Sequence, residues 1–310
     1  MSTVAPVQES VHHSLSLKSS IEECPMSSGI VGVVKLDDAL LEKEITKILQ
    51  VGHVKEEYSE YRFGTWQNYI LWNGTGRQAD SLFRGVEGGA LRTELGAQFE
   101  YLNSVIEENF FTENIKMVRA NLLQDALLIP HRDYVEFRKD SDRLARLHIP
   151  LQTNPHALHS ENGHVFHMRK GEIWVLRVDH VHSACNPSEV PRISIVIDVC
   201  LDGAPLESVL KNPLNGESKV EPMLIKRDQI DDDFLQSVWS LKQVINEANY
   251  KDVVMFLSRI HFYKDVDSTC FFDWLIEICR SSGDTALLEK SIRYKSYLIA
   301  RRELQERFAL

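Results

Sequence analysis

A histidine and an aspartate stand two residues apart in LLIPHRDYVEF, residues 127–137. Side chains at positions i and i+2 of a strand point the same way, so His131 and Asp133 can offer two ligands to one metal ion. An iron(II) centre of the two-histidine, one-carboxylate type needs one further histidine and leaves its other positions open. The stretch DHVHSACN contains two candidates for it, His180 and His182.

An arginine, Arg192, lies ten residues beyond His182 in a run of isoleucine and valine. In a strand it shares a face with Ser194 and Asp198, while the other face is wholly apolar. A buried guanidinium is costly without an anion, so Arg192 predicts a protein carboxylate or an anionic ligand beside it. A dicarboxylate such as 2-oxoglutarate would satisfy it through a bidentate pair. This spacing favours His182 over His180 as the third ligand.

The same His-Arg-Asp run also opens the catalytic loop of protein kinases. That loop requires an asparagine five residues after the aspartate, together with a glycine-rich loop and a DFG triplet. Position 138 is Arg138, and neither other motif occurs, so we exclude a kinase. A lone H-x-D pair is more often a hydrogen-bonded pair at a strand end than a metal site. The combination with His182 and Arg192 favours iron.

The hydrophobic residues around these candidates follow two repeats, the alternation of β-strands and the longer period of α-helices. Residues 115–200 read as short strands broken by turns, and RLARLHIPL puts Leu144, Arg146 and His148 on one face, opposite an apolar one. Such strands are typical of a sandwich or barrel whose interior holds a ligand. Before them, DDALLEKEITKIL predicts a helix, and after residue 205 apolar stripes predict further helices, ending in a charged one, TALLEKSIRYKSYLIARRELQERF.

Several of these segments resemble one known family. IPHRDYVEF, GHVFHMRKGEIWVLRVDHVHSACN and PRISIVIDVCLDG look like the Fe(II)/2-oxoglutarate-dependent aspartyl/asparaginyl hydroxylases. Within that family they are most similar to the bacterial free-amino-acid hydroxylases typified by cis-proline 3-hydroxylase. The resemblance runs from residue 29 to the end of the chain and includes WQNYILWNGTG and DWLIEI.

The resemblance implies an α+β fold, a double-stranded β-helix (jelly-roll, cupin-like) core with flanking helices and a C-terminal helical region. It implies Fe(II) on His131, Asp133 and His182, with 2-oxoglutarate as co-substrate, O2 as oxidant and Arg192 on the distal carboxylate of 2-oxoglutarate. Related halogenases lack the carboxylate ligand so that chloride can coordinate, so Asp133 favours hydroxylation.

The resemblance also places a second pair in the pocket. Arg146 and His148 match an R-x-H motif that helps to hold 2-oxoglutarate, and Arg146 has the alternative role of meeting the carboxylate of an amino-acid substrate. Arg119 and Asn121, two apart in IKMVRANLL, are candidate substrate-binding residues, with a salt bridge or a cap as the alternative for each.

The bulk properties of the chain limit its partners. Its 310 residues are 43% hydrophobic and 26% charged, which is usual for a soluble globular protein. A formal net charge of −10 weighs against a nucleic-acid partner. No apolar run is long enough to span a bilayer and no secretory signal is evident, so we expect no membrane association and a cytoplasmic location.

We expect a flexible N-terminal extension over residues 1–28, a jelly-roll catalytic domain over 29–204 and a helical region over 205–310. The helical tail could form a homodimer interface or cover the barrel, and the sequence leaves both open. The leading hypothesis is a dioxygenase that hydroxylates an unactivated C–H bond of a free L-amino acid, proline-like or else pipecolate, citrulline or arginine. Analogy suggests a role in natural-product biosynthesis. Its rivals are a peptidyl Asp/Asn-type hydroxylase and a non-catalytic jelly-roll binding protein.

Overall fold

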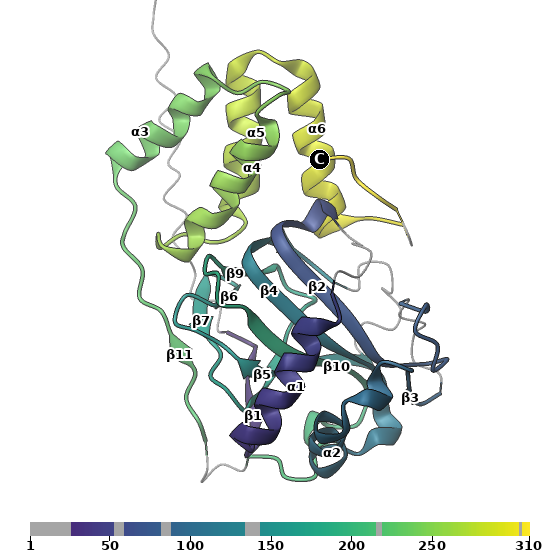
Figure 1. The fold of residues 1–310 in the computed structure, drawn as a ribbon. Helices are drawn as coiled ribbons and strands as arrows, with labels where there is room; N and C mark the ends of the chain where they lie inside the picture. Colours follow the sequence, from purple (N-terminus) through teal and green to yellow (C-terminus); the bar gives the residue numbers. More distant parts are fainter. Residues whose placement is uncertain (1–25, 53–58, 82–87, 134–142, 215–218, 304–305) are drawn as a thin grey trace, which may run out of the picture.

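The computed structural model describes residues 26–52, 59–81, 88–133, 143–214, 219–303 and 306–310. A strongly curved antiparallel sheet forms one half of the molecule, and a group of helices from the C-terminal third stands at one end of it (Figure 1). Two earlier helices, α1 (Asp38–Gln50) and α2 (Glu100–Asn109), lie along the sheet (Figure 1).

The sheet is one continuous path of paired strands. In order of pairing, the strands on this path are β1 (Gly29–Val33), β8 (Glu172–Leu176), β5 (Leu144–Gln152), β10 (Arg192–Cys200), β4 (Ile115–His131), β9 (His182–Asn186), β6 (Leu158–Glu161), β7 (His164–His167) and β11 (Met223–Leu224). Off this path, β2 (Arg62–Asn73) pairs with β4 and with β3 (Leu91–Arg92). The curled antiparallel sheet with flanking helices is the jelly-roll core that the sequence predicted.

Strand β4 carries the chain around the corner of the barrel. Its first part pairs with β10 as far as Leu123, and its last part pairs with β9 from Ala126 to His131. At the change of partner Asp125 has a φ of 40°, and the facing Gly64 in β2 has a φ of 74°. A Cβ on Gly64 would lie 1.8 Å from the Asp125 carbonyl oxygen, so only glycine fits there. This bend brings the end of β4 onto β9.

The two central strands have the faces that their alternation predicted. The apolar face of β10, Ile193, Ile195 and Ile197, belongs to the main hydrophobic core together with Leu147 and Ile149 of β5. The opposite face of β10 is also buried, although it carries charged and polar side chains. Polar groups on a buried face point into the barrel, and this is where a site has to lie.

The first helix, α1 (Asp38–Gln50), is the one predicted directly after β1. The Asp37 carboxylate caps its first turn by accepting a hydrogen bond of 2.9 Å from the Leu40 N–H. The second, α2 (Glu100–Asn109), packs in the same core through Leu102 and Ile106. The sequence analysis did not single out α2.

The C-terminal helices α3 (Asp232–Ser240), α4 (Tyr250–Arg259), α5 (Cys270–Ser282) and α6 (Thr285–Lys295) share a second hydrophobic core. Tyr61 and Ile129 of the sheet region belong to it. The prediction of a charged helix up to the end of the chain was wrong. The chain passes from α6 into a π-helical turn, Ser296–Ala300, and is extended at Arg301, after which Phe308 packs against the rings of Tyr294 and Tyr297. Among the helices of the described residues, none is long and apolar enough to cross a membrane.

The boundaries of the three expected parts stay predictions. Strand β1 begins at Gly29, but Ser28 is already buried, and its N–H donates a hydrogen bond of 2.9 Å to the Glu161 carboxylate. The rest of the expected extension, residues 1–25, lies outside the described part of the chain. Strand β11, which follows residue 205, pairs with β7 of the barrel.

A buried histidine outside the group of metal-ligand candidates predicts a pH dependence of stability. His261 is 3% exposed, its Nε2 lies 2.9 Å from the Ser160 hydroxyl, and burial, with a smaller effect of Arg227, lowers its pKa to about 3. The unfolded chain therefore takes up a proton below pH 6.5 that the folded chain refuses until about pH 3. Stability is highest above pH 6.5 and falls with pH between these values, by about 1.4 kcal/mol per pH unit for this residue.

We expect His261→Gln to reduce the slope of the unfolding free energy against pH between 6.5 and 4.5, by the contribution of this one residue. The exposed His156 provides the control, since His156→Gln removes an exposed imidazole and keeps the buried His261. Urea unfolding at several pH values measures both slopes. Equal slopes for the wild-type chain and His261→Gln would contradict the assignment.

Candidate active site

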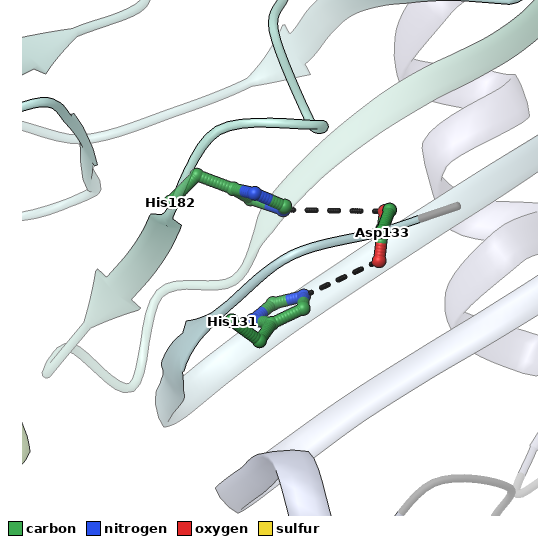
Figure 2. Close-up of side chains that lie close together, drawn as sticks. All are labelled: His131, Asp133 and His182. Atoms are coloured by element: carbon green, nitrogen blue, oxygen red, sulfur yellow. Dashed lines mark ion pairs between the residues drawn. The ribbon is translucent and has the colours of Figure 1, made fainter. Parts of the chain in front are cut away.

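Three side chains that the sequence singled out converge at one end of the barrel (Figure 2). His131 ends β4, His182 begins β9, and the two residues face each other in the strand register. Asp133 follows two residues after β4. Its Oδ1 lies 3.5 Å from the Nε2 of His131, and its Oδ2 lies 4.0 Å from the Nε2 of His182. One ligand atom from each residue lies within 4.8 Å of the others.

Backbone carbonyls orient both imidazoles. The Nδ1 of His131 donates to the Ile129 carbonyl at 2.6 Å, and the Nδ1 of His182 donates to the His180 carbonyl at 3.0 Å. Each Nε2 therefore carries a lone pair, which points at Asp133. Burial and the neighbouring His182 lower the pKa of His131 to about 3, and burial also lowers the pKa of His182. Both rings are neutral, as metal ligands must be.

The third group is a carboxylate. Burial alone would raise the pKa of Asp133, but Arg146 and the two histidines outweigh it and hold the pKa below its usual range. Two neutral imidazoles and one carboxylate on one side of a space form the donor set that suits non-heme Fe(II). The residues present therefore fit the metal. The neighbouring His180 lies elsewhere, with its Nδ1 2.8 Å from the Glu161 carboxylate.

Arg192 is buried in the barrel, 3% exposed. One of its terminal nitrogens donates to the Nδ1 of His159 at 3.1 Å, and its Nε has no hydrogen-bond partner among the described residues. Burial lowers its pKa to about 10 because no carboxylate of the described residues pairs with it. An uncompensated buried cation that stays protonated fits the anionic end of a ligand.

Two uncharged histidines surround this cation. His148 and His159 have ring centroids 5.8 Å apart, and burial, followed by the charge of Arg192, lowers the pKa of each well below its usual value. The Nδ1 of His148 is buried without a hydrogen-bond partner in the described residues, and so is the hydroxyl of Ser194. The barrel interior around Arg192 thus contains two further polar atoms that have no hydrogen-bond partner among the described residues.

Arg146 and Arg119 share one carboxylate. Asp198, fully buried, lies 2.7 Å from the Nε of Arg146 and 2.5 Å from a terminal nitrogen of Arg119. Arg146 also forms an ion pair with Asp133. The strand register explains the cluster, because Arg146 lies directly opposite Asp198 in the β5–β10 pair. Arg119 therefore forms the salt bridge that was the predicted alternative to a substrate-binding role.

Asn121 lies on the same face of β4 as Arg119, but its side chain binds Trp66 and not Asp198. Its Oδ1 accepts a hydrogen bond of 2.5 Å from the Trp66 indole. Three residues at or next to the site were not predicted from the sequence: His159, Tyr61 and Arg302. His159 had a weak signal, a histidine in a short segment between turns, whereas Tyr61 and Arg302 lie far from the motif in the chain.

Comparison with solved structures finds remote likeness. The non-heme alpha ketoglutarate dependent epimerase SnoN from nogalamycin biosynthesis is 11% identical, with a TM-score of 0.35 over 64% of this chain and 94% of that one. AviO1 from Streptomyces viridochromogenes Tue57 is 18% identical, with a TM-score of 0.33 over 57% of this chain and 92% of that one.

Comparison of sequences is decisive. The aspartyl/asparaginyl beta-hydroxylase model matches residues 37–201, and the C-terminal model of L-proline 3-hydroxylase matches residues 207–306. The chain is 35% identical to L-proline cis-3-hydroxylase 1 of Streptomyces sp over 92% of its length and 99% of the relative's. It is 33% identical to L-proline cis-4-hydroxylase of Rhizobium meliloti (strain 1021) over 91% and 99%. The chain belongs to the Fe(II)/2-oxoglutarate-dependent aspartyl/asparaginyl hydroxylase family, in the branch that carries the C-terminal region of L-proline 3-hydroxylase.

Proposed function

We propose that this protein is a dioxygenase that hydroxylates an unactivated C–H bond of a free L-amino acid, with L-proline as the first candidate. The observation that carries the proposal is the closely grouped His131, Asp133 and His182 in a barrel that also buries the uncompensated Arg192. Family membership and the proline hydroxylases among the relatives supply the substrate class. Pipecolate, citrulline and arginine are the alternatives to proline.

The three ligands would hold Fe(II) through the Nε2 atoms of the histidines and the carboxylate of Asp133. When bound, Fe(II) with 2-oxoglutarate and O2 supplies the oxidising power that replaces C–H by C–OH, with succinate and CO2 as the other products. The contribution of the protein is to orient 2-oxoglutarate and the substrate C–H bond relative to the metal ligands. The carbonyls of Ile129 and His180 fix the rings, so neither imidazole has to turn or lose a proton to bind the metal.

Arg192 would bind the distal carboxylate of 2-oxoglutarate. Its free Nε and its buried charge favour a bidentate anionic partner. His148 and His159 are neutral, so they add hydrogen-bonding capacity without a second cation, and the acceptor Nδ1 of His159 restrains the guanidinium. The carboxylate would thereby be held at a fixed distance from the metal ligands.

Arg119 and Arg146 would bind the carboxylate of the amino-acid substrate. The two guanidinium groups share Asp198, and Arg146 also pairs with Asp133, which is a metal ligand. Guanidinium groups bind carboxylates through paired, charge-assisted hydrogen bonds, so two of them next to a metal ligand suit a small carboxylate.

Replacing Arg119 with methionine is expected to raise the KM for the amino acid about 10- to 100-fold, since a hydrogen bond to a charged group contributes roughly 1.5–3 kcal/mol. The KM for 2-oxoglutarate should stay unchanged because Arg192 is retained. Arg280→Met, which removes an exposed arginine paired with Glu277, is the matched control. Steady-state kinetics with each substrate varied in turn give both constants. An unchanged KM for the amino acid would remove Arg119 from this role.

The proposed function is tested in two steps. Under anaerobic conditions, adding Fe(II) and then 2-oxoglutarate should produce the weak visible charge-transfer band of the chelate. An aerobic screen of free amino acids by mass should then find one product heavier by one oxygen, with succinate formed in proportion. Absence of the band would support the non-catalytic binding protein, and a band with turnover only on peptides would support the peptidyl hydroxylase.

A further inference from the structure

The C-terminal segment after α6 returns to the metal-ligand loop. Past the π-helical turn at Ser296–Ala300 the backbone is extended at Arg301, and the next side chain, Arg302, is 7% exposed. Arg301 itself is exposed, its side chain 75% accessible beside Glu303. Two neighbouring arginines thus differ completely in environment, although nothing in their local sequence distinguishes them.

Arg302 reaches the residue that separates two metal ligands. Its terminal nitrogen donates a hydrogen bond of 2.8 Å to the carbonyl of Arg132, which lies between His131 and Asp133. The N–H of Arg132 in turn donates to the Leu298 carbonyl at 3.0 Å. Both backbone groups of Arg132 are therefore held by the C-terminal segment.

This contact lies where the strand ladder has ended. Strand β4 stops at His131, so the backbone that carries Asp133 has left the sheet. Apart from the contacts to Arg132, its described support is the bond of 2.7 Å from the Asp133 N–H to the Val178 carbonyl. The Asp133 carboxylate is contacted directly by Arg146, and the bonds to Arg132 hold the backbone that carries it.

The same guanidinium acts on the other ligand through an aromatic ring. Arg302 lies over the ring of Tyr61, 5.4 Å from its centroid, and Tyr61 meets the ring of His131 edge to face at 5.2 Å. The positive charge of the guanidinium is attracted to the electron-rich face of the ring. The hydroxyl of Tyr297, over whose ring Arg302 also lies, is anchored on the buried Glu60 at 2.7 Å. The support behind His131 is thus fixed at several points.

We propose that Arg302 is a positioning residue for the metal centre, and that the C-terminal segment from Leu298 to Arg302 completes that centre by holding Arg132 and Tyr61. The inference rests on the proposed function, because it assumes that His131 and Asp133 bind the metal. The inference extends the proposed function, because the metal affinity would then depend on Arg302, which lies 170 residues from Arg132 in the chain.

The test is a titration of the metal-free full chain with Co(II) alone, followed by its visible absorption. Arg302→Met should weaken Co(II) binding about 10- to 100-fold, the usual effect of removing a group that orients a metal ligand, and should alter the absorption spectrum of the bound ion. Arg301→Met should bind as the wild-type chain does. Arg302→Lys, which keeps the charge and one donor, should fall between wild type and Arg302→Met. All titrations are made well below the unfolding temperature of each variant.

The outcomes separate the two hypotheses. Failure of the wild-type chain to bind Co(II), or binding that survives His131→Ala, would refute the metal centre itself. Normal binding by the wild type together with equal affinity and spectrum for Arg302→Met would overturn the role of Arg302 alone. If Arg302→Met does not fold, Arg302→Gln takes its place, since it removes the charge over Tyr61, and wild-type affinity of that variant would overturn the proposal equally.

Discussion

Asp133→Ala is expected to reduce hydroxylation by at least roughly 1,000-fold, which corresponds to about 4 kcal/mol of lost stabilisation. Asp133 is the one anionic ligand of the three, and its two oxygens face both imidazoles. Its loss would remove a ligand and the negative charge that balances the metal. Product formation by mass and Co(II) affinity of the metal-free chain should fall together.

The matched control for this substitution is Asp179→Ala. Asp179 is a partly exposed aspartate paired with Arg177, and it lies in the loop just before His182. That variant should keep wild-type turnover and metal affinity. Substantial hydroxylation by Asp133→Ala would mean that another group supplies the third ligand.

Arg192→Met is expected to act in opposite directions on binding and on stability. The KM for 2-oxoglutarate should rise roughly 30-fold or more, because losing one partner of a buried charge pair costs about 2–5 kcal/mol. The chain without ligands should become more stable by about 1–4 kcal/mol, since an apolar side chain of similar volume replaces a buried charge that has no carboxylate beside it. Kinetics and urea unfolding without 2-oxoglutarate measure the two effects.

Arg177→Met serves as the control for Arg192→Met, since it removes an arginine whose side chain is 47% exposed. Neither the KM for 2-oxoglutarate nor the unfolding free energy should change appreciably, because exposed ion pairs contribute about 0–1 kcal/mol. A variant at Arg192 that is less stable than the wild type would show that the charge is compensated within the protein. An unchanged KM would place the 2-oxoglutarate carboxylate elsewhere.

Much of the fold could be predicted because its signals are local. Alternation in Leu144–Gln152 and Arg192–Cys200 reports which face of a strand is apolar, and Asp37 before an apolar stripe reports a helix start. These patterns depend on the geometry of one element and not on its partners. The end of the last helix was mispredicted because its charged sequence suits a helix, while the tertiary contacts of Arg302 turn the chain away after Ala300.

The sequence by itself determined the chemistry of the site: an H-x-D pair at a strand end, a histidine ten residues before a lone arginine, and the donor types that suit Fe(II). Only the tertiary structure decided which groups surround them. Arg119 meets Asp198 across 79 residues, His159 meets Arg192 across 33, and Arg302 meets Arg132 across 170. Such contacts arise from strand register and from the packing of separate elements, and no local period in the sequence records either one.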